Sequence, residues 1–117
     1  MPSTPSQGEI WRVLLDPGQG AEMGKARPCV IVSSPNVGRL PLHIIVPITD
    51  WKSHYNRYPW MTKLIPSAQN GLSKISAADG YQVRSVSPLR FLDILGKVSH
   101  DDLLDIEASI QISIEVI

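Results

Sequence analysis

The sequence has little of what would mark a disulfide-bonded, zinc-binding or membrane-spanning protein. Its 117 residues include one cysteine, Cys29, so neither a disulfide nor a cysteine-based zinc site has the residues it needs. The longest apolar runs are far shorter than the roughly 20 residues of a membrane-spanning helix. Cys29 stands inside an apolar run, where a lone cysteine is usually a small buried hydrophobic residue. A chain of this length, with 43% hydrophobic residues, is predicted to fold as one domain around a sizeable core.

The chain also lacks net charge, but its charges are unevenly distributed. Residues 25–79 contain seven basic residues against two acids, Asp50 and Asp79. From Ser99 onward there is no Lys or Arg, and the acidic residues there are Asp101, Asp102, Asp105, Glu107 and Glu115. The local field, not the overall charge, attracts a polyanion, so a neutral chain can still carry a basic face. The alternative is a solvated surface of mixed charge.

The first seven residues are polar and rich in proline. They have neither the basic region nor the apolar stretch of a signal peptide. We therefore expect a disordered lead at residues 1–7, a single domain at residues 8–117 and a cytoplasmic location. The sequence shows no internal repeat and no second domain boundary.

Apolar patterning predicts a mostly β protein. The expected strands cover residues 9–15, 29–33, 42–47, 60–65, 72–76, 81–86 and 94–98. The near-continuous apolar run at 42–47 predicts burial on both faces of its strand. Asn70-Gly71 is a strong turn signal, and Ser87-Pro88 predicts a short helical turn.

A C-terminal helix is expected after Ser99. The Ser99 side chain can cap it, with Asp102 three residues further on. Its apolar face is expected to include Leu103, Leu104, Ala108 and Ile110. This face should pack on the sheet.

The segment at residues 27–33, RPCVIVS, is the most informative in the chain. Arg27 and Pro28 lead directly into an apolar run that predicts a buried strand. A guanidinium is permanently charged and presents a planar fork of donors that suits phosphate. Arg27 is therefore a candidate anion-binding residue. The alternative is a surface arginine that is solvated or paired with a carboxylate.

Several other segments accompany this one at characteristic intervals along the sequence. They are GEIWRVLLDP at residues 8–17, VPIT at 46–49, QVRSV at 82–86 and LGKVS at 95–99. With these motifs, from about Gly8 to the C-terminus, the chain resembles the MazF/PemK (Kid) toxins of bacterial toxin-antitoxin pairs. The resemblance implies a mainly β fold, an SH3-like barrel of antiparallel strands with a C-terminal α-helix. It further implies a homodimer that acts as a sequence-selective endoribonuclease on single-stranded RNA, needs no metal or cofactor, and is silenced by an antitoxin.

The family's reaction uses the 2′-hydroxyl of the RNA as the nucleophile and leaves a 2′,3′-cyclic phosphate. Arg27 matches the family's catalytic arginine, and its guanidinium would stabilise the charge that develops on the scissile phosphate. A pKa above about 12 makes arginine a poor proton donor, so the electrostatic role is favoured. Thr49 matches the family's catalytic Thr/Ser, whose hydroxyl can hydrogen-bond a phosphate oxygen. A threonine at a strand end can also simply form a turn.

The general base is less well defined. Some PemK relatives use an arginine two positions before an aspartate; if that aspartate is Asp79, Ala77 takes the arginine's place. An ungapped match backwards from Gln82 puts Tyr81 at the aspartate position instead. Ala21 occupies the place of a histidine in that branch. Asp79 can act as a base or bind a base edge, although an Asp-Gly pair is commonly a turn.

Two irregular segments are expected to border the RNA. Residues 16–24 hold three glycines and a proline, which predicts a mobile loop; in relatives the equivalent loop borders the RNA groove and moves when antitoxin binds. Residues 50–59 interleave aromatic and basic side chains, which can stack bases while holding phosphates, or can fold back onto the core. The expected RNA-binding residues are Lys25, Lys52, His54, Arg57, Gln82 and Arg84.

Two other functions fit the same fold. CcdB-type gyrase poisons bind a protein target without catalysis, but they use a C-terminal Trp-Gly-Ile tail, and this chain ends SIEVI with no tryptophan nearby. A non-catalytic SH3-like binding module would leave Arg27 and Thr49 without a joint purpose.

Overall fold

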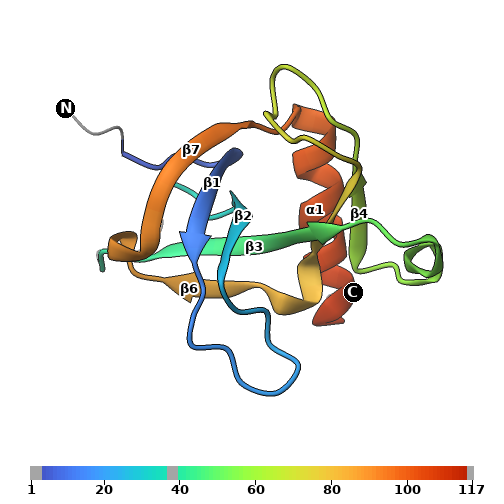
Figure 1. Cartoon of the computed structure of the whole chain (residues 1–117), viewed down its shortest axis with the longest axis horizontal. Coiled ribbons are helices and arrows are strands. Elements are labelled where there is room, and N and C mark those ends of the chain that lie inside the picture. The colour runs from blue at the N-terminus through green and yellow to red at the C-terminus, as the bar shows by residue number, and fades with distance from the viewer. Residues whose placement is uncertain (1–3, 37–39, 116–117) are drawn as a thin grey trace.

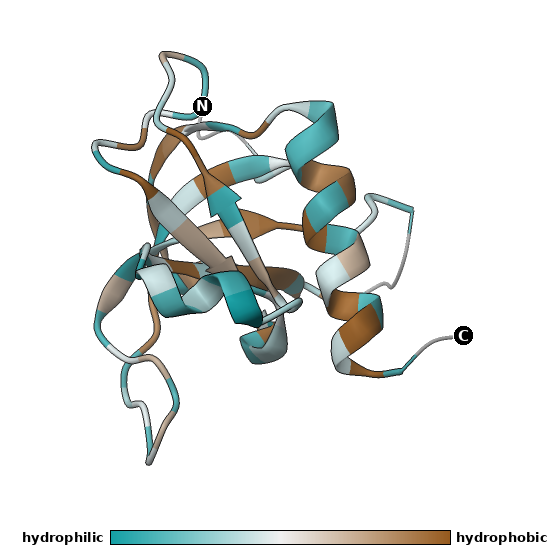
Figure 2. Cartoon of the chain, turned by 90° about the vertical axis from the view of Figure 1, so that its right-hand side faces the viewer, coloured by the Kyte–Doolittle hydropathy of each residue, from teal (hydrophilic) through white to brown (hydrophobic). Residues whose placement is uncertain are grey.

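The structure is a computed structural model, described here for residues 4–36 and 40–115 (Figure 1). Within these residues, seven strands form an antiparallel sheet in the order β4-β5-β3-β2-β1-β7, and β6 also pairs with β3. The strands are β1 (Glu9–Leu14), β2 (Ala26–Ile31), β3 (His43–Asp50), β4 (Met61–Leu64), β5 (Ser76–Asp79), β6 (Arg84–Val86) and β7 (Phe91–Lys97). The sheet is strongly curved, and helix α1 (His100–Ser113) lies along one side of it (Figures 1 and 2). The predicted fold class is confirmed.

Strand β3 is the centre of the sheet and has neighbours on both edges. One edge pairs with β2, while the other pairs with β6 at residues 43–45 and with β5 at residues 48–50. Pro47, which has no N–H to donate, falls in the gap between these last two partners. A proline can therefore stand in a central strand without breaking a ladder hydrogen bond on that edge.

Two hydrophobic clusters occupy the two faces of the sheet. Successive residues of β2 and of β3 point alternately into one cluster and the other, so both strands contain continuous apolar runs. The first cluster lies between the sheet and α1 and consists of Ile10, Val30, Val46, Ile48, Leu64, Ala78, Val98 and Ile106. The second is on the other face and consists of Val13, Leu15, Cys29, Ile31, Ile45 and Val86. The predicted burial of Cys29 is confirmed.

Helix α1 begins where the sequence predicts, because the Ser99 hydroxyl accepts a hydrogen bond from the Asp102 N–H at 3.1 Å. Ile106 is fully buried, and Leu103 and Ile110 pack beside it on the first cluster. Two of the predicted apolar positions, Leu104 and Ala108, are exposed instead. The helix rests on the sheet through a narrower stripe than predicted. The structure has no helix in its described residues that is long and apolar enough to cross a membrane.

Two predicted strands are wrong in their bounds. Residues 72–75 do not form a strand, because the Asn70 side chain accepts hydrogen bonds from the N–H groups of Ser67 and Leu72 and holds a turn there. This confirms the Asn70-Gly71 turn signal, and Gly71 has the positive φ of 69° that such a turn needs. Strand β5 therefore starts only at Ser76.

The segment predicted as a strand at 81–86 begins with a short 3-10 turn, η2 (Gly80–Gln82). The Asp79 carboxylate caps this turn by accepting a hydrogen bond from the Tyr81 N–H at 3.1 Å. Gly80 lies against α1 so closely that a Cβ there would collide with the Ser109 hydroxyl. Strand β6 starts after the turn, at Arg84.

Other boundaries shift by a few residues. Strand β2 already starts at Ala26, so Arg27 and Pro28 lie inside it; Pro28 is tolerated because pairing with β3 begins only at Cys29. The predicted turn at Ser87-Pro88 is the 3-10 turn η3 (Pro88–Arg90). Part of the expected N-terminal lead, residues 1–3, lies outside the described residues. In residues 4–7, the Gln7 side chain donates to the Val32 carbonyl at 3.0 Å.

Candidate active site

The register of the sheet brings Arg27 and Thr49 to neighbouring positions on one face. Strand β2 pairs with β3 from Ile31 opposite Ile45 to Cys29 opposite Pro47, and Arg27 and Thr49 each lie two residues beyond this last pair on their own strands. Residues directly opposite each other on antiparallel strands project to the same face. Because side chains alternate along a strand, Arg27 and Thr49 lie on the same face of the sheet as Cys29 and Pro47.

The same row continues across the next two strands. Thr49 pairs with Ala77 on β5, and Ala77 pairs with Lys63 on β4. Asp79 follows Ala77 by two residues and so projects to the same face. The three predicted catalytic residues, Arg27, Thr49 and Asp79, thus share one face of the sheet.

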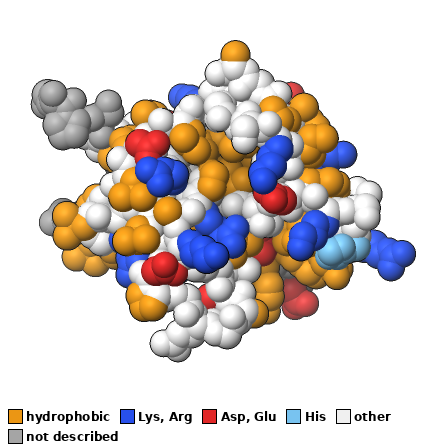
Figure 3. All heavy atoms as spheres, in the orientation of Figure 1, with side chains coloured by type: hydrophobic (Ala, Val, Ile, Leu, Met, Phe, Trp, Pro, Cys, Tyr) orange, Lys and Arg blue, Asp and Glu red, His pale blue; other side chains and the backbone are white. Residues whose placement is uncertain are grey.

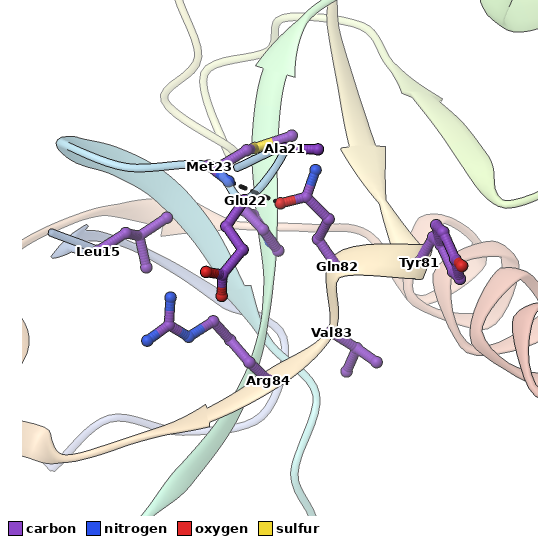
Figure 4. Close-up of a pocket in the computed structure, with 9 residues that line it drawn as sticks. Leu15, Ala21, Glu22, Met23, Tyr81, Gln82, Val83 and Arg84 are labelled. Carbon is purple, nitrogen blue, oxygen red and sulfur yellow. Dashed lines mark hydrogen bonds between the residues drawn. The ribbon is translucent and has the colours of Figure 1, made fainter. Parts of the chain in front are cut away.

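A cavity of about 490 Å³ opens on this face over Pro47, where β3 has no partner between β5 and β6. The 3-10 turn η2 fills part of the gap and carries Gln82 to the cavity, and β6 contributes Arg84. The β1–β2 loop forms the opposite wall (Figure 4). The cavity is lined by Leu15, Ala21, Glu22, Met23, Pro47, Tyr81, Gln82, Val83 and Arg84.

The positive charges of Arg27 and Arg84 both influence the buried thiol of Cys29. Burial raises the pKa of Cys29 to about 12, and the positive charges of Arg84 and Arg27 oppose this rise. The thiol is therefore a neutral packing group. Arg27 donates from Nε to the Gly24 carbonyl at 3.2 Å. Within the described residues, neither arginine forms an ion pair, whereas Arg12 is paired with Asp93 at 2.8 Å.

Asp79 is a buried carboxylate, with a relative exposure of 5%. Burial raises its pKa above the ordinary 3.8, and hydrogen bonds from the Tyr81 N–H and from Gln82 partly offset this rise. Asp79 therefore caps a turn and also has a carboxylate whose pKa is raised. A raised pKa makes a carboxylate a better proton acceptor near neutral pH.

The side-chain amide of Gln82 connects Asp79 to the β1–β2 loop. Its Nε2 donates to Asp79 Oδ2 at 3.2 Å, and its Oε1 accepts from the Met23 N–H at 2.8 Å. Figure 4 shows Gln82 reaching up to the loop, while Glu22 on the same loop extends its carboxylate towards Arg84. The loop is irregular, as predicted, and Ala21 lines the cavity where the resemblance implies a histidine.

The remaining predicted RNA-binding residues lie outside the cavity. Lys25 is exposed at the end of the β1–β2 loop and has a positive φ of 63°. Lys52, His54 and Arg57 are exposed on or beside the 3-10 turn η1 (Ser53–Arg57), which follows β3. In Figure 3 basic side chains gather at the centre of the viewed face, over β3 and β6, and again with a histidine at the right, over η1.

The structure adds one cation that the sequence argument did not single out. Lys63 continues the row of Arg27 and Thr49 at the β4 edge, and its ammonium lies 5.2 Å from the ring centroid of Trp51. The alternation of polar and apolar residues at 61–64 could have predicted that Lys63 points away from the core. Only the pairing of β4 with β5 shows that it lies in the same row as Thr49. Of the seven cations counted in residues 25–79, Lys74 is paired with Asp50 at 3.0 Å, and Arg39 lies outside the described residues.

No group of three or more His, Cys, Asp or Glu residues that could hold a metal ion occurs in the described ranges, 4–36 and 40–115.

Fold and site together define a small antiparallel β protein with an arginine, a threonine and a buried carboxylate on one face of its sheet. A model of the PemK-like, MazF-like toxins of type II toxin-antitoxin systems matches residues 6–114. The chain belongs to this family.

Similar proteins agree with this assignment. The chain is 28% identical over 116 residues to endoribonuclease MazF9 of Mycobacterium tuberculosis, covering 94% of this chain and 96% of that one. The crystal structure of MazF from Deinococcus radiodurans superposes with a TM-score of 0.80 at 21% identity, over 98% of this chain and all of that one. A mycobacterial endoribonuclease solved in complex with its cognate antitoxin gives a TM-score of 0.76 at 16% identity, over 97% and 98% of the two chains. At these identities the two structures support the fold alone.

Proposed function

We propose that this toxin is an endoribonuclease that cleaves single-stranded RNA, including messenger RNA, at short sequences and without a metal ion. The observation that carries the proposal is that Arg27 and Thr49 lie on one face of the sheet, each two residues beyond the pair of Cys29 with Pro47, and that Pro47 and Arg84 line a cavity on that face. The similarity to an endoribonuclease of Mycobacterium tuberculosis supports the same activity. A phosphate between these side chains would meet permanent positive charge and a hydroxyl donor.

The reaction is an in-line displacement within the RNA itself. The 2′-oxygen forms a bond to phosphorus and gives up its proton, while the bond from phosphorus to the 5′-oxygen breaks and that oxygen takes up a proton. The products are a 2′,3′-cyclic phosphate and a 5′-hydroxyl. Arg27 would stabilise the charge on the equatorial oxygens, and the Thr49 hydroxyl would donate a hydrogen bond to one of them.

Asp79 is our candidate for the base that accepts the 2′-hydroxyl proton. It lies on the same face as Arg27 and Thr49, and its raised pKa suits proton transfer near neutral pH. If Asp79 corresponds to the aspartate of some PemK relatives, the arginine position of those relatives is held by Ala77, a small buried side chain between Thr49 and Lys63. Proton transfer in this chain would therefore rest on Asp79.

The active form would be a homodimer in the cytoplasm, silenced by a cognate antitoxin. The family description and the mycobacterial toxin-antitoxin structure support an antitoxin partner. Support for a dimer comes from apolar side chains left exposed around η3 and β7, where Leu89 is 93%, Leu92 48% and Ile94 47% exposed. A second copy of the chain would cover them, and light scattering on the purified protein tests this.

The deciding experiment is cleavage of single-stranded RNA by the purified protein in excess EDTA. We expect cleavage to persist, to leave a 2′,3′-cyclic phosphate and to stop when the 2′-hydroxyl at the cut site is replaced by hydrogen. Arg27→Ala should lose roughly 10² to 10³ in rate. Arg12→Ala is the matched control, because Arg12 is an exposed arginine on β1 that is paired with Asp93. Cleavage of DNA, or dependence on added magnesium, would contradict the proposal.

A further inference from the structure

The aromatic side chains of this protein are concentrated in one place outside the hydrophobic clusters. The chain has three Trp, three Tyr and one Phe. Two of these, Trp11 and Phe91, pack against the second cluster. The other five belong to neither cluster among the described residues, and together with His54 they form what we call the aromatic surface: Trp51, His54, Tyr55, Tyr58, Trp60 and Tyr81.

The rings of the aromatic surface contact one another in sequence. Trp51 meets Tyr55 edge-on at 5.7 Å, and His54 bridges Tyr55 and Tyr58. Tyr58 stacks on Trp60 at 4.8 Å with an interplanar angle of 8°, and Trp60 meets Tyr81 at 6.0 Å. These rings are therefore ordered by packing against each other, not by burial in the core.

The chain segment that supplies most of the aromatic surface carries charge of one sign. Residues 51–63 contain Lys52, Arg57 and Lys63 and no acidic residue. Lys52 and Arg57 are exposed, and Lys63 lies over the Trp51 ring. Aromatic rings combined with cations suit a single-stranded nucleic acid, whose bases stack on rings while its phosphates meet positive charge. A purely apolar partner would leave this charge without a counterpart.

The aromatic surface meets the candidate active site at both of its ends. At one end Trp51 follows Thr49 by two residues, and Lys63 lies in the same cross-strand row as Thr49 and Arg27. Three strand spacings separate Lys63 from Arg27, which is about 14 Å.

At the other end Tyr81 lines the active-site cavity beside Gln82. Its ring is 70% exposed and projects from η2 towards helix α1 (Figure 4). Tyr81 and Trp60 also border a second cavity of about 350 Å³, which Ile112 of α1 helps to line and to which Glu115 brings an acidic side chain. An exposed ring beside a cavity of this size leaves room for a stacked base.

We propose that the aromatic surface binds the nucleotides that flank the cleaved phosphate, by stacking their bases on its rings, with Tyr81 as the principal exposed ring. This proposal rests on the endoribonuclease function proposed above and adds a second binding region to it. Stacking tolerates any base, so the surface contributes affinity for longer RNA and no sequence preference. The sequence preference remains a property of the cavity.

The test compares two RNAs that share the cut site, one minimal and one extended by flanking nucleotides, each with deoxyribose at the cut site to prevent cleavage. Tyr81→Ala should bind the extended RNA roughly 10- to 100-fold more weakly, and this loss should be larger than the loss for the minimal RNA. A 2-aminopurine in the flank should be quenched by the wild-type protein and less so by Tyr81→Ala. Tyr81→Phe should behave as wild type, since it keeps the ring.

Two controls keep the result interpretable. Lys63→Ala should weaken binding of the extended RNA, whereas Lys97→Ala, on β7 at the opposite end of the strand order, should not.

Circular dichroism checks that each variant is folded. Equal binding of the extended RNA by wild type and Tyr81→Ala would overturn the proposal, and so would a loss confined to binding of an antitoxin peptide. If the natural RNA were bound with quenching but never cleaved, the endoribonuclease proposal would fail while stacking remained supported.

Discussion

Gln82 donates a hydrogen bond from its side-chain amide to the carboxylate of Asp79 at 3.2 Å. The oxygen of the same amide accepts the Met23 N–H, so one side chain connects the candidate base to the loop that walls the cavity. A donor to a carboxylate favours its charged form and lowers its pKa. The position of the β1–β2 loop and the protonation of Asp79 are therefore physically coupled through Gln82.

We expect Gln82→Met, which keeps the length of the side chain but removes both hydrogen bonds, to loosen the loop and to raise the pKa of Asp79 further. The acidic limb of the pH-rate profile should move to higher pH, because Asp79 must be deprotonated to act as a base. Amide exchange at Met23 should quicken, and stability should fall by about 1 kcal/mol. Gln111→Ala, on the exposed side of α1, should change neither. An unmoved pH profile would separate Gln82 from Asp79 in the reaction.

Asp79 itself should leave a signature in the pH dependence of stability. Its pKa is higher in the folded chain than the ordinary 3.8, so the folded protein binds this proton more tightly than the unfolded chain does. Lowering the pH through the folded pKa towards 3.8 therefore adds stability from this group, and that contribution is absent at neutral pH.

The Asp79→Asn variant isolates this contribution, because all other carboxylates stay in place. In denaturant titrations at a series of pH values, the stability of the wild type relative to Asp79→Asn should rise as the pH falls. A stability difference that is constant with pH would show that the Asp79 pKa is not raised. Cleavage by Asp79→Asn should be strongly reduced if Asp79 is the base.

The contribution of the Thr49 hydroxyl can be separated from that of the side chain's shape. Thr49→Val keeps the branched shape and removes the donor, so we expect cleavage to slow about 10- to 100-fold, the worth of one hydrogen bond to a charged group. Because Thr49 is half-buried, the Thr49→Val protein should be about as stable as the wild type. Thr49→Ser restores a hydroxyl and should recover most of the rate. If Thr49→Val cleaved as fast as wild type, the hydroxyl would have no part in catalysis.

Local sequence patterns predict the strands that carry Arg27 and Thr49, whereas the candidate roles of the two residues came from the resemblance to the toxin family. Each of these residues stands in or beside an apolar run that predicts a strand. Antiparallel pairing of the two consecutive strands puts Arg27 and Thr49 on one face of the sheet. Asn70-Gly71 and Ser99 are short-range signals that hold for the same reason.

The parts that the sequence did not predict depend on distant contacts. The 3-10 turn at Gly80 exists because Asp79 caps it and because the approach of Ser109 leaves no room for a side chain, and Ser109 is far along the chain. The cavity lies over Pro47, at the gap between β5 and β6 that this turn fills only in part. Whether the rings of residues 51–60 join the core or each other is likewise decided by tertiary packing, since both arrangements fit the same composition.

The RNA and the antitoxin should compete for the basic region around Lys52 and Arg57. Both are polyanions if the antitoxin carries an acidic segment, and both would be drawn to the same exposed cations. Lys52→Glu and Arg57→Glu should weaken both ligands, and each lost phosphate contact should reduce the salt slope for RNA by about 0.7. Lys97→Glu is the matched control, because Lys97 is an exposed lysine on β7 and does not belong to the basic region around Lys52 and Arg57. The measurement is a fluorescence competition between an uncleavable RNA and an acidic peptide from a cognate antitoxin. Simultaneous and independent binding of both ligands would show that their sites are separate and that the antitoxin acts from a distance.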